Sequence, residues 1–274
     1  FGEIFLMTRP LILLTNDDGI HSPGLMAAIE AVHDLADLVV VAPKDQQSAM
    51  GRSLPGGISG AIFVEELRLN GDRLPAYSVP GSPAQAVLYG LHEVCRQQRP
   101  DLVISGINYG ENLGTSVMVS GTVGAALQAA DMGVPALAIS LETDPAYHAR
   151  FGYDVDWRTA VHFARWLAGL ALSQPFPPDV DVLKMDIPAA ATPQTPWRLT
   201  RQSRLPYYET IPSDRLRFED EVRLPYQIKI DRARLESDSD IYAFVVDHLV
   251  SVTPLSLDMS SRTLLSQFAA QLGS

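Results

Sequence analysis

Four short apolar runs, separated by amphipathic segments, constrain most strongly how this chain can fold. They occupy residues 11–14, 38–42, 102–105 and 136–140. Continuous apolar runs of this length are typical of strands in a parallel sheet that helices cover on both faces. The segments between them carry helix-start signals at Ser22-Pro23, Pro83 and Thr122. The pattern predicts an α/β fold with a doubly wound, mostly parallel sheet in three αβα layers.

The rest of the chain adds elements around this sheet. Residues 62–67 and 77–79, with Asn70-Gly71 between them, predict a hairpin at its margin. A helix over 156–172 and a strand over 180–185 complete the expected core. Of the 28 residues from 213 to 240, 14 are charged, against 19% in the whole chain, which is more than a buried element accepts. This stretch should project from the core, with exposed strands at 215–218 and 226–230.

These patterns divide the chain into three expected parts. Residues 7–195 are expected to form the Rossmann-like core, and residues 1–6 precede it as an upstream extension. Residues 196–245 form a protruding, β-rich oligomerisation arm. Residues 246–274 supply a strand and an amphipathic helix that return to the core or pack on a partner subunit.

Charge and cysteine content exclude several classes of partner. The chain has 32 acidic and 21 basic residues, a net charge of −11, and no cluster of Lys and Arg. Nucleic-acid duplexes and anionic membrane surfaces both require a basic surface. No apolar run reaches the roughly 18 residues that span a bilayer, and residues 1–6 lack the features of a signal peptide. The single cysteine, Cys95, cannot form an intramolecular disulfide, which favours a reducing compartment; we expect a cytoplasmic protein.

An acidic loop, Thr15-Asn16-Asp17-Asp18-Gly19, follows the first apolar run. Ligands of open parallel sheets bind at the carboxyl ends of the strands. Adjacent aspartates repel each other, and a divalent cation removes the repulsion by taking carboxylate oxygens as ligands. Gly19 allows the turn that lets both side chains face one ion. An ordinary turn with helix-capping acids accounts for the same residues, so the loop alone leaves both interpretations open.

Two further loops supply oxygen ligands. Ser48 follows the second run, and Asn108 lies in the glycine-rich loop after the third. Ser120-Gly121-Thr122 then begins a helix, whose free backbone N–H groups and dipole favour an anion. Together the loops predict a magnesium- or manganese-type site beside a phosphate ester. The chain has no His- or Cys-rich set for zinc, and no G-x-G-x-x-G or Walker A loop in the required context.

At these residues the sequence closely resembles the SurE family, the survival protein E nucleotidases. The matching stretches are residues 13–25, 41–43 with Gln47-Ser48, 81–84, 100–108, 120–126 and 250–255. They are spread along the chain, so the resemblance extends over nearly all of it from Met7, the expected natural start. The resemblance implies a Rossmann-like core, assembled as homodimers or homotetramers through the C-terminal arm. Thr115-Ser116 and Val119 depart from the acidic and aromatic residues usual in the family, which bears on substrate preference.

The resemblance also implies roles for individual residues. One divalent cation per subunit, Mg²⁺ or Mn²⁺, would be held by Asp17, Asp18, Ser48 and Asn108. Ser120, Gly121 and Thr122 would contact the phosphate, and we add Asn16 to this set. Asp17, Asp18 and Asn108 are the expected catalytic residues; whether water or an aspartate attacks the phosphorus stays open.

The expected function is a divalent-metal-dependent phosphomonoesterase that hydrolyses nucleoside 5′-monophosphates, with 3′-nucleotides and short polyphosphate as further candidate substrates. Two alternatives stay open. One is a metal-dependent hydrolase of another class, although the chain has no G-x-S-x-G motif. The other is a non-catalytic nucleotide-binding module that uses the anion site alone.

Overall fold

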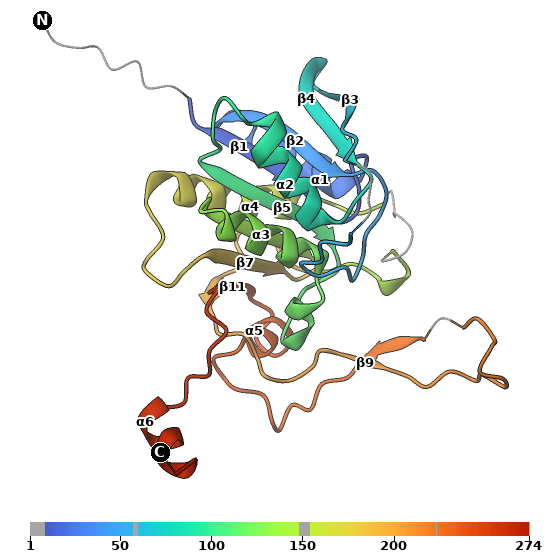
Figure 1. Cartoon of the computed structure of the whole chain (residues 1–274), viewed down its shortest axis with the longest axis vertical. Helices are drawn as coiled ribbons and strands as arrows, with labels where there is room; N and C mark the ends of the chain where they lie inside the picture. The colour runs from blue at the N-terminus through green and yellow to red at the C-terminus, as the bar shows by residue number, and fades with distance from the viewer. Residues whose placement is uncertain (1–8, 57–59, 148–153, 223, 274) are drawn as a thin grey trace, which may run out of the picture.

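A nine-stranded sheet carries the structure (Figure 1). The computed structural model describes residues 9–56, 60–147, 154–222 and 224–273. The strands of the sheet are β1 (Leu11–Thr15), β2 (Asp37–Pro43), β3 (Phe63–Leu69), β4 (Asp72–Val79), β5 (Leu102–Tyr109), β6 (Ala136–Leu141), β7 (Val182–Ile187), β8 (Trp197–Leu199) and β11 (Val250–Leu255). Their order across the sheet is β3-β4-β2-β1-β5-β6-β7-β11-β8.

Strands β4, β2, β1, β5, β6 and β7 pair in parallel, so the predicted mostly parallel fold is confirmed. From β1 the chain goes to β2 on one side, and later enters β5 on the other side. In such sheets, ligands usually bind at the carboxyl ends of the strands on either side of the reversal, here β1 and β5. The predicted marginal hairpin is also present, since β3 pairs antiparallel with β4 at the sheet edge.

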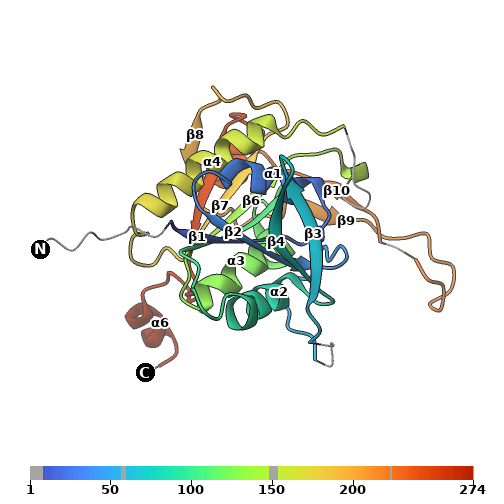
Figure 2. The ribbon, with the colours of Figure 1, turned by 90° about the horizontal axis from the view of Figure 1, so that it is seen from above.

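Helices cover both faces of the sheet (Figure 2). Helices α1 (Pro23–Val32) and α4 (Arg158–Ser173) lie on one face, and α2 (Pro83–Tyr89) and α3 (Gly121–Asp131) lie on the other. The helix expected from Pro83 continues beyond α2 as a π-helical turn, Gly90–Val94, where Gly90 packs closely on Leu13 and Val41 of the sheet.

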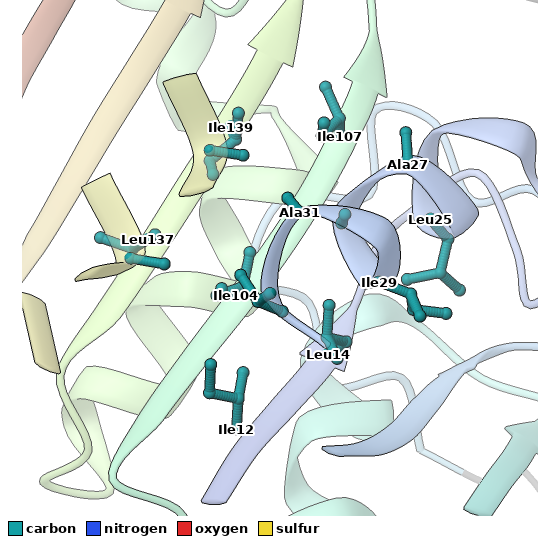
Figure 3. Packing of buried hydrophobic residues seen from close by; sticks show 14 of the residues in the cluster. Ile12, Leu14, Leu25, Ala27, Ile29, Ala31, Ile104, Ile107, Leu137 and Ile139 are labelled. Atoms are coloured by element: carbon teal, nitrogen blue, oxygen red, sulfur yellow. The ribbon is translucent and has the colours of Figure 1, made fainter. Parts of the chain in front are cut away.

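Side chains of β1 point alternately to the two helical layers, which explains why its sequence is apolar throughout. Ile12 and Leu14 pack with α1 in one buried cluster (Figure 3). Leu11 and Leu13 belong to a second cluster, on the side of α2 and α3. Each side chain of this size that is fully buried contributes about 1.5–3 kcal/mol to stability. The double-sided burial fixes β1, and therefore the loop that follows it.

Serine side chains cap the first turns of helices α1 and α3. The Ser22 hydroxyl accepts a hydrogen bond from the backbone N–H of Leu25 at 3.2 Å, and Ser120 accepts one from Val123 at 3.1 Å. Such a cap satisfies one of the otherwise unpaired N–H groups in the first turn. The caps fix where α1 and α3 begin relative to the strand ends.

The arm differs in part from expectation. A short antiparallel pair, β9 (Tyr208–Thr210) with β10 (Tyr226–Ile228), starts a segment that extends away from the sheet (Figure 1). The strand predicted over 215–218 is wrong, because those residues form bends and turns. Leu216 and Phe218 are 93% and 92% exposed. Apolar alternation stabilises a strand only where a surface buries the apolar face, and these side chains have no such cover within this chain.

The C-terminal part returns to the sheet through β11, which pairs antiparallel with β7. Helix α5 (Asp240–Val245) packs on β11, whereas α6 (Leu265–Gln271) buries none of its residues and lies apart from the sheet (Figure 1). Strand β8, at the start of the segment assigned to the arm, lies at the edge of the main sheet. The three-part division of the chain stays a prediction. Among the described residues, no helix combines the length and the apolar character that crossing a membrane requires.

Two helical glycines test how closely α1 packs on the sheet. A Cβ at Gly24 would overlap the backbone carbonyl of Ile107 in β5, whereas a Cβ at Gly169 in α4 would meet nothing within 4 Å. We expect Gly24→Ala to lower the free energy of unfolding by about 1–3 kcal/mol, because overpacking must push α1 from the sheet. Gly169→Ala should raise it by up to about 1 kcal/mol through helix propensity.

Urea unfolding followed by circular dichroism measures both effects. Equal effects of the two substitutions would contradict the close approach of α1 to β5.

Candidate active site

The loop after β1 is fixed by its own side chain, Asn16. The Asn16 amide nitrogen donates to the Gly19 carbonyl oxygen at 3.0 Å and to the Ser22 hydroxyl at 2.6 Å. The backbone N–H of Gly19 donates back to Asn16 Oδ1 at 3.2 Å, and Gly19 has a φ of 98°, which favours glycine. Asn16 was expected to bind phosphate. Its amide is committed to the loop, so a phosphate contact through the same atoms would have to displace these bonds.

Asp17 faces the start of α3. Its Oδ1 accepts a hydrogen bond from the Thr122 hydroxyl at 2.6 Å. A Cβ added at Gly121 would lie 2.7 Å from Asp17 Oδ2, so only glycine lets the helix approach the carboxylate this closely. The backbone N–H groups of Gly121 and Thr122 also favour the charged form of Asp17. The helix start therefore presents its donors to the first aspartate.

Asp18 connects the two other loops. Its Oδ1 accepts from the Gln46 side chain at 3.2 Å, and its Oδ2 accepts from the backbone N–H of Tyr109 at 3.2 Å. The backbone of Gln47 also bonds to the Asp17 carbonyl oxygen at 2.6 Å. Loops that are far apart in the sequence thus meet at the two carboxylates, as expected for neighbouring parallel strands.

Both carboxylates are buried, at 5% and 3% exposed for Asp17 and Asp18. Burial raises the pKa of Asp17 to about 6, against the hydrogen bonds that lower it. Burial and repulsion by Asp17 raise the pKa of Asp18 to about 8. No ion pair between described residues involves either carboxylate. Two adjacent, buried carboxylates are stabilised by a bound proton or a bound cation, and a hard divalent ion fits their oxygen donors.

Asn108 and Ser48, the other two predicted metal ligands, differ in their position relative to the two aspartates. Asn108 is half-buried at the end of β5, next to the Tyr109 N–H that holds Asp18, and its side-chain nitrogen donates to the Gly110 carbonyl oxygen at 2.6 Å. In the loop after β2, the described contacts with the aspartates come from Gln46 and Gln47. Ser48 is exposed in the next turn.

A register shift in β5 precedes Asn108, which lies at the carboxyl end of this central strand. The pairing of β5 with β6 is irregular between Ser105 and Asn108. Gly106 in this stretch has a φ of 135°, and a Cβ there would overlap the Ile139 carbonyl oxygen of β6. Glycine is thus required for the irregular backbone that ends in Asn108.

The predicted phosphate residues lie at one helix start but differ in role. Ser120 is 6% exposed and its hydroxyl caps α3. The Thr122 hydroxyl is donated to Asp17. The backbone N–H groups of Gly121 and Thr122 interact with Asp17, so a phosphate at the first turn of α3 would share these donors with that carboxylate.

Sequence reasoning missed the two groups that hold Asp18. The Gln46 amide and the Tyr109 backbone N–H are common features of any loop, and no residue spacing distinguishes them. It also missed Lys184 and Asp186 of β7, both 0% exposed. Here a signal was available, because charged residues in an otherwise apolar strand must be paired when they are buried.

The chain is similar in sequence and in fold to known proteins. The sequence model of the family described as Survival protein SurE matches residues 12–209. The chain is 39% identical to the 5′-nucleotidase SurE of Thermococcus gammatolerans, over 92% of this chain and 91% of that protein. It is 41% identical to the 5′-nucleotidase SurE of Methanocella arvoryzae, over 91% and 93%. Among solved structures, the SurE protein of Aquifex aeolicus is similar with a TM-score of 0.75 and 26% identity, covering 96% of this chain and 100% of that one.

The raised pKa values predict how stability depends on pH when chelator is present. The pKa of Asp18 rises from 3.8 to about 8 on folding, so above pH 4 the unfolded chain loses a proton that the folded chain retains. The free energy of unfolding should therefore fall as the pH rises from about 5 to 8. Asp18→Asn removes this charge and should reduce the fall by at least about 1.4 kcal/mol.

Urea titrations of both proteins with EDTA, at several pH values, measure the difference. The same pH dependence in both would contradict the buried, repelling pair.

Proposed function

The chain belongs to the SurE family, and from that premise we propose that it is a 5′-nucleotidase, which hydrolyses nucleoside monophosphates to nucleoside and phosphate. The proposal draws on the relatives named 5′-nucleotidase SurE, which are 39% and 41% identical over most of the chain. One observation carries it. The buried pair Asp17 and Asp18 lies against the start of α3, with the Thr122 hydroxyl 2.6 Å from Asp17. An acidic pair therefore lies beside a helix N-terminus, a feature that favours anions.

The proposal includes one divalent cation per subunit, Mg²⁺ or Mn²⁺, held by Asp17, Asp18, Asn108 and Ser48. Support comes from the donor chemistry, since carboxylate, amide and hydroxyl oxygens are ligands that hard cations accept. Asp18 accepts a hydrogen bond from the backbone N–H of Tyr109 at the end of β5. Because Asn108 is the preceding residue, this bond keeps it close to the two aspartates. Ser48 would have to turn inward from its exposed position. Such an ion, when bound, withdraws electron density from a phosphoryl oxygen and makes water easier to deprotonate.

The chain's own groups would act on the substrate in three ways. The backbone N–H groups of Gly121 and Thr122, which also interact with Asp17, would be shared with the phosphoryl oxygens, where preorganised donors stabilise developing negative charge. Asp17 or Asp18 would orient the attacking water and accept its proton. The buried setting of both aspartates strengthens these electrostatic interactions, because less water screens them.

The proposal extends to 3′-nucleotides and short polyphosphate as candidate substrates. Its support is that a helix N-terminus such as that of α3, capped by Ser120, favours a phosphate group, which all these ligands carry. We also propose a cytoplasmic location. It rests on the single cysteine, Cys95, which is buried and free, as is common in reducing compartments.

We further propose that the protein forms a homodimer or homotetramer through its arm and C-terminal helix. The exposed apolar side chains of these segments support the proposal; they are Leu216, Phe218, Leu224, Tyr226 and Ile228 in the arm, and Leu265, Phe268 and Leu272 around α6. Clusters of exposed apolar side chains on projecting segments commonly mark protein–protein contacts.

The catalytic proposal is tested by Asp17→Asn, which keeps the size of the side chain and removes its charge. We expect phosphate release from nucleoside monophosphates with Mn²⁺ or Mg²⁺ to fall by at least about 100-fold, with an unchanged circular dichroism spectrum. Asp72→Asn, at an exposed position in β4, is the matched control and should keep wild-type activity.

Full activity of Asp17→Asn, or undiminished turnover in excess EDTA, would contradict the metal role. Nucleotide binding without phosphate release would favour the binding module. Hydrolysis of acyl esters or glycosides in place of nucleotides would favour another class of hydrolase.

The assembly proposal is tested by Leu216→Ser/Phe218→Ser. Because both side chains are almost fully exposed in the chain, the double substitution should leave the fold intact. It should weaken self-association by at least about tenfold, since each buried side chain of this size contributes about 1.5–3 kcal/mol. Light scattering over a concentration series measures this, with Val64→Ser in β3, 71% exposed, as control. A wild-type mass at every concentration would exclude the arm from the contact.

A further inference from the structure

A network of charged side chains lies buried in the fold, and none of its members is a residue proposed to hold the metal or the phosphate. Lys184 and Asp186 of β7 and Asp240 of α5 are each 0% exposed. The Lys184 ammonium contacts the Asp186 carboxylate and lies 3.3 Å from Asp240 Oδ2. Burial opposes the charge of Lys184, but the two carboxylates outweigh it and raise the pKa of the ammonium. Lys184 is therefore charged at neutral pH.

The two carboxylates hold the backbone of one loop. Asp186 Oδ1 accepts from the backbone N–H of Asn112 at 2.7 Å, and Asp240 Oδ2 accepts from that of Gly114 at 3.0 Å. The Asn112 side chain is held as well, since it donates to the Ser140 hydroxyl of β6 at 2.9 Å. Carboxylates that accept backbone N–H groups form strong, short, directional bonds. The loop from Asn112 to Gly114 is thus fastened to β7, β6 and α5.

Asp240 also joins this loop to the base of the arm. Its Oδ1 accepts from the backbone N–H of Ser203 at 2.9 Å, and the backbone N–H of Thr115 donates to the Leu205 carbonyl oxygen at 3.2 Å. The same carboxylate therefore aligns the site loop on one side and the segment leading to β9 on the other.

The fastened loop lies between two parts of the candidate active site. Asn112 follows Asn108 by four residues, and Gly114 precedes Ser120 by six. The short connection from Gly114 to α3 is a single 3₁₀ turn, Thr115–Met118. Movement at residues 112–114 would therefore shift Asn108, the start of α3, or both.

Stability alone does not account for a lysine at this position. A buried ion pair loses the hydration of both ions, and well-packed apolar residues of similar volume often stabilise a fold as well or better. What the ions provide is directional hydrogen bonding to the loop. The ammonium neutralises part of the charge of each carboxylate, and the carboxylate oxygens still accept specific backbone N–H groups.

We propose that Lys184 is a positioning residue for the reaction: through Asp186 and Asp240 it fixes residues 112–114, and with them the spacing between Asn108 and the start of α3. This inference rests on the proposed metal-dependent function. The charged partners of Lys184 among the described residues are Asp186 and Asp240, neither of which is a proposed metal or phosphate residue.

The test is Lys184→Met, which keeps an unbranched side chain one atom shorter and removes its charge. Met185→Ala, on the adjacent residue of β7, is the matched control, because Met185 is 0% exposed and packs in the cluster on the α1 side of the sheet. Both substitutions are expected to lower the thermal midpoint. Only Lys184→Met should weaken Mn²⁺ binding to the metal-free protein, by about 10-fold or more, and lower kcat with little change in KM.

Mn²⁺ binding is measured by electron paramagnetic resonance at a temperature where circular dichroism shows every variant folded. Wild-type Mn²⁺ affinity and kcat in folded Lys184→Met would overturn the proposal, and so would equal losses in Met185→Ala. If Lys184→Met does not fold, Asp186→Asn decides, because its amide oxygen can still accept the Asn112 N–H but more weakly. Reduced Mn²⁺ affinity then supports the proposal, and wild-type affinity overturns it.

Measurements on the wild-type protein distinguish a failure of this inference from a failure of the proposed function on which it rests. Failure of the wild type to bind Mn²⁺ or to release phosphate would refute the proposed function itself. A wild type that does both, with unchanged affinity in the variants, would refute only the role of Lys184.

Discussion

The repulsion between Asp17 and Asp18 is the constraint around which the rest of the site is arranged. Both carboxylates, 5% and 3% exposed, are costly to ionise because burial removes the water that would solvate them, and repulsion by Asp17 raises the pKa of Asp18 further. The surrounding protein reduces that cost with aligned donors, from Thr122 to the first aspartate and from Tyr109 to the second. These donors leave the charge itself uncompensated. A site of this kind is unstable alone and suited to a divalent ion, so the same feature that costs folding energy would provide binding energy for the ligand.

The fold makes this arrangement possible by bringing together loops that are distant in the chain. β1 is buried on both faces, so its carboxyl end is fixed in space. Glycines then permit the close approaches on which the site depends, with Gly121 against Asp17 and Gly106 against β6. Below them, Lys184 and its two carboxylates link the loop at Asn112 to the base of the arm. Through this link, the segment proposed for assembly and the residues proposed for catalysis share one buried anchor.

Much of the core and some of the site could be predicted from the sequence. Apolar runs with helix caps specify parallel strands and crossovers because burial and capping are local, periodic properties, as at Ser22. The twin aspartates are conspicuous because charge repulsion makes such a pair costly without a role. Gln46 and the Tyr109 N–H could not be predicted, since their role depends on which loops meet in space. The strand expected at 215–218 was wrong for a related reason: alternation indicates a face to be buried, and Leu216 and Phe218 lie exposed in this chain.

Anomalous diffraction from crystals grown with Mn²⁺ tests the central claim most directly. The account predicts one strong manganese peak per subunit, within about 2.5 Å of carboxylate oxygens from both Asp17 and Asp18, with the Asn108 side chain turned toward it. A peak bound elsewhere, or crystals saturated with Mn²⁺ that show none between the two aspartates, would contradict it.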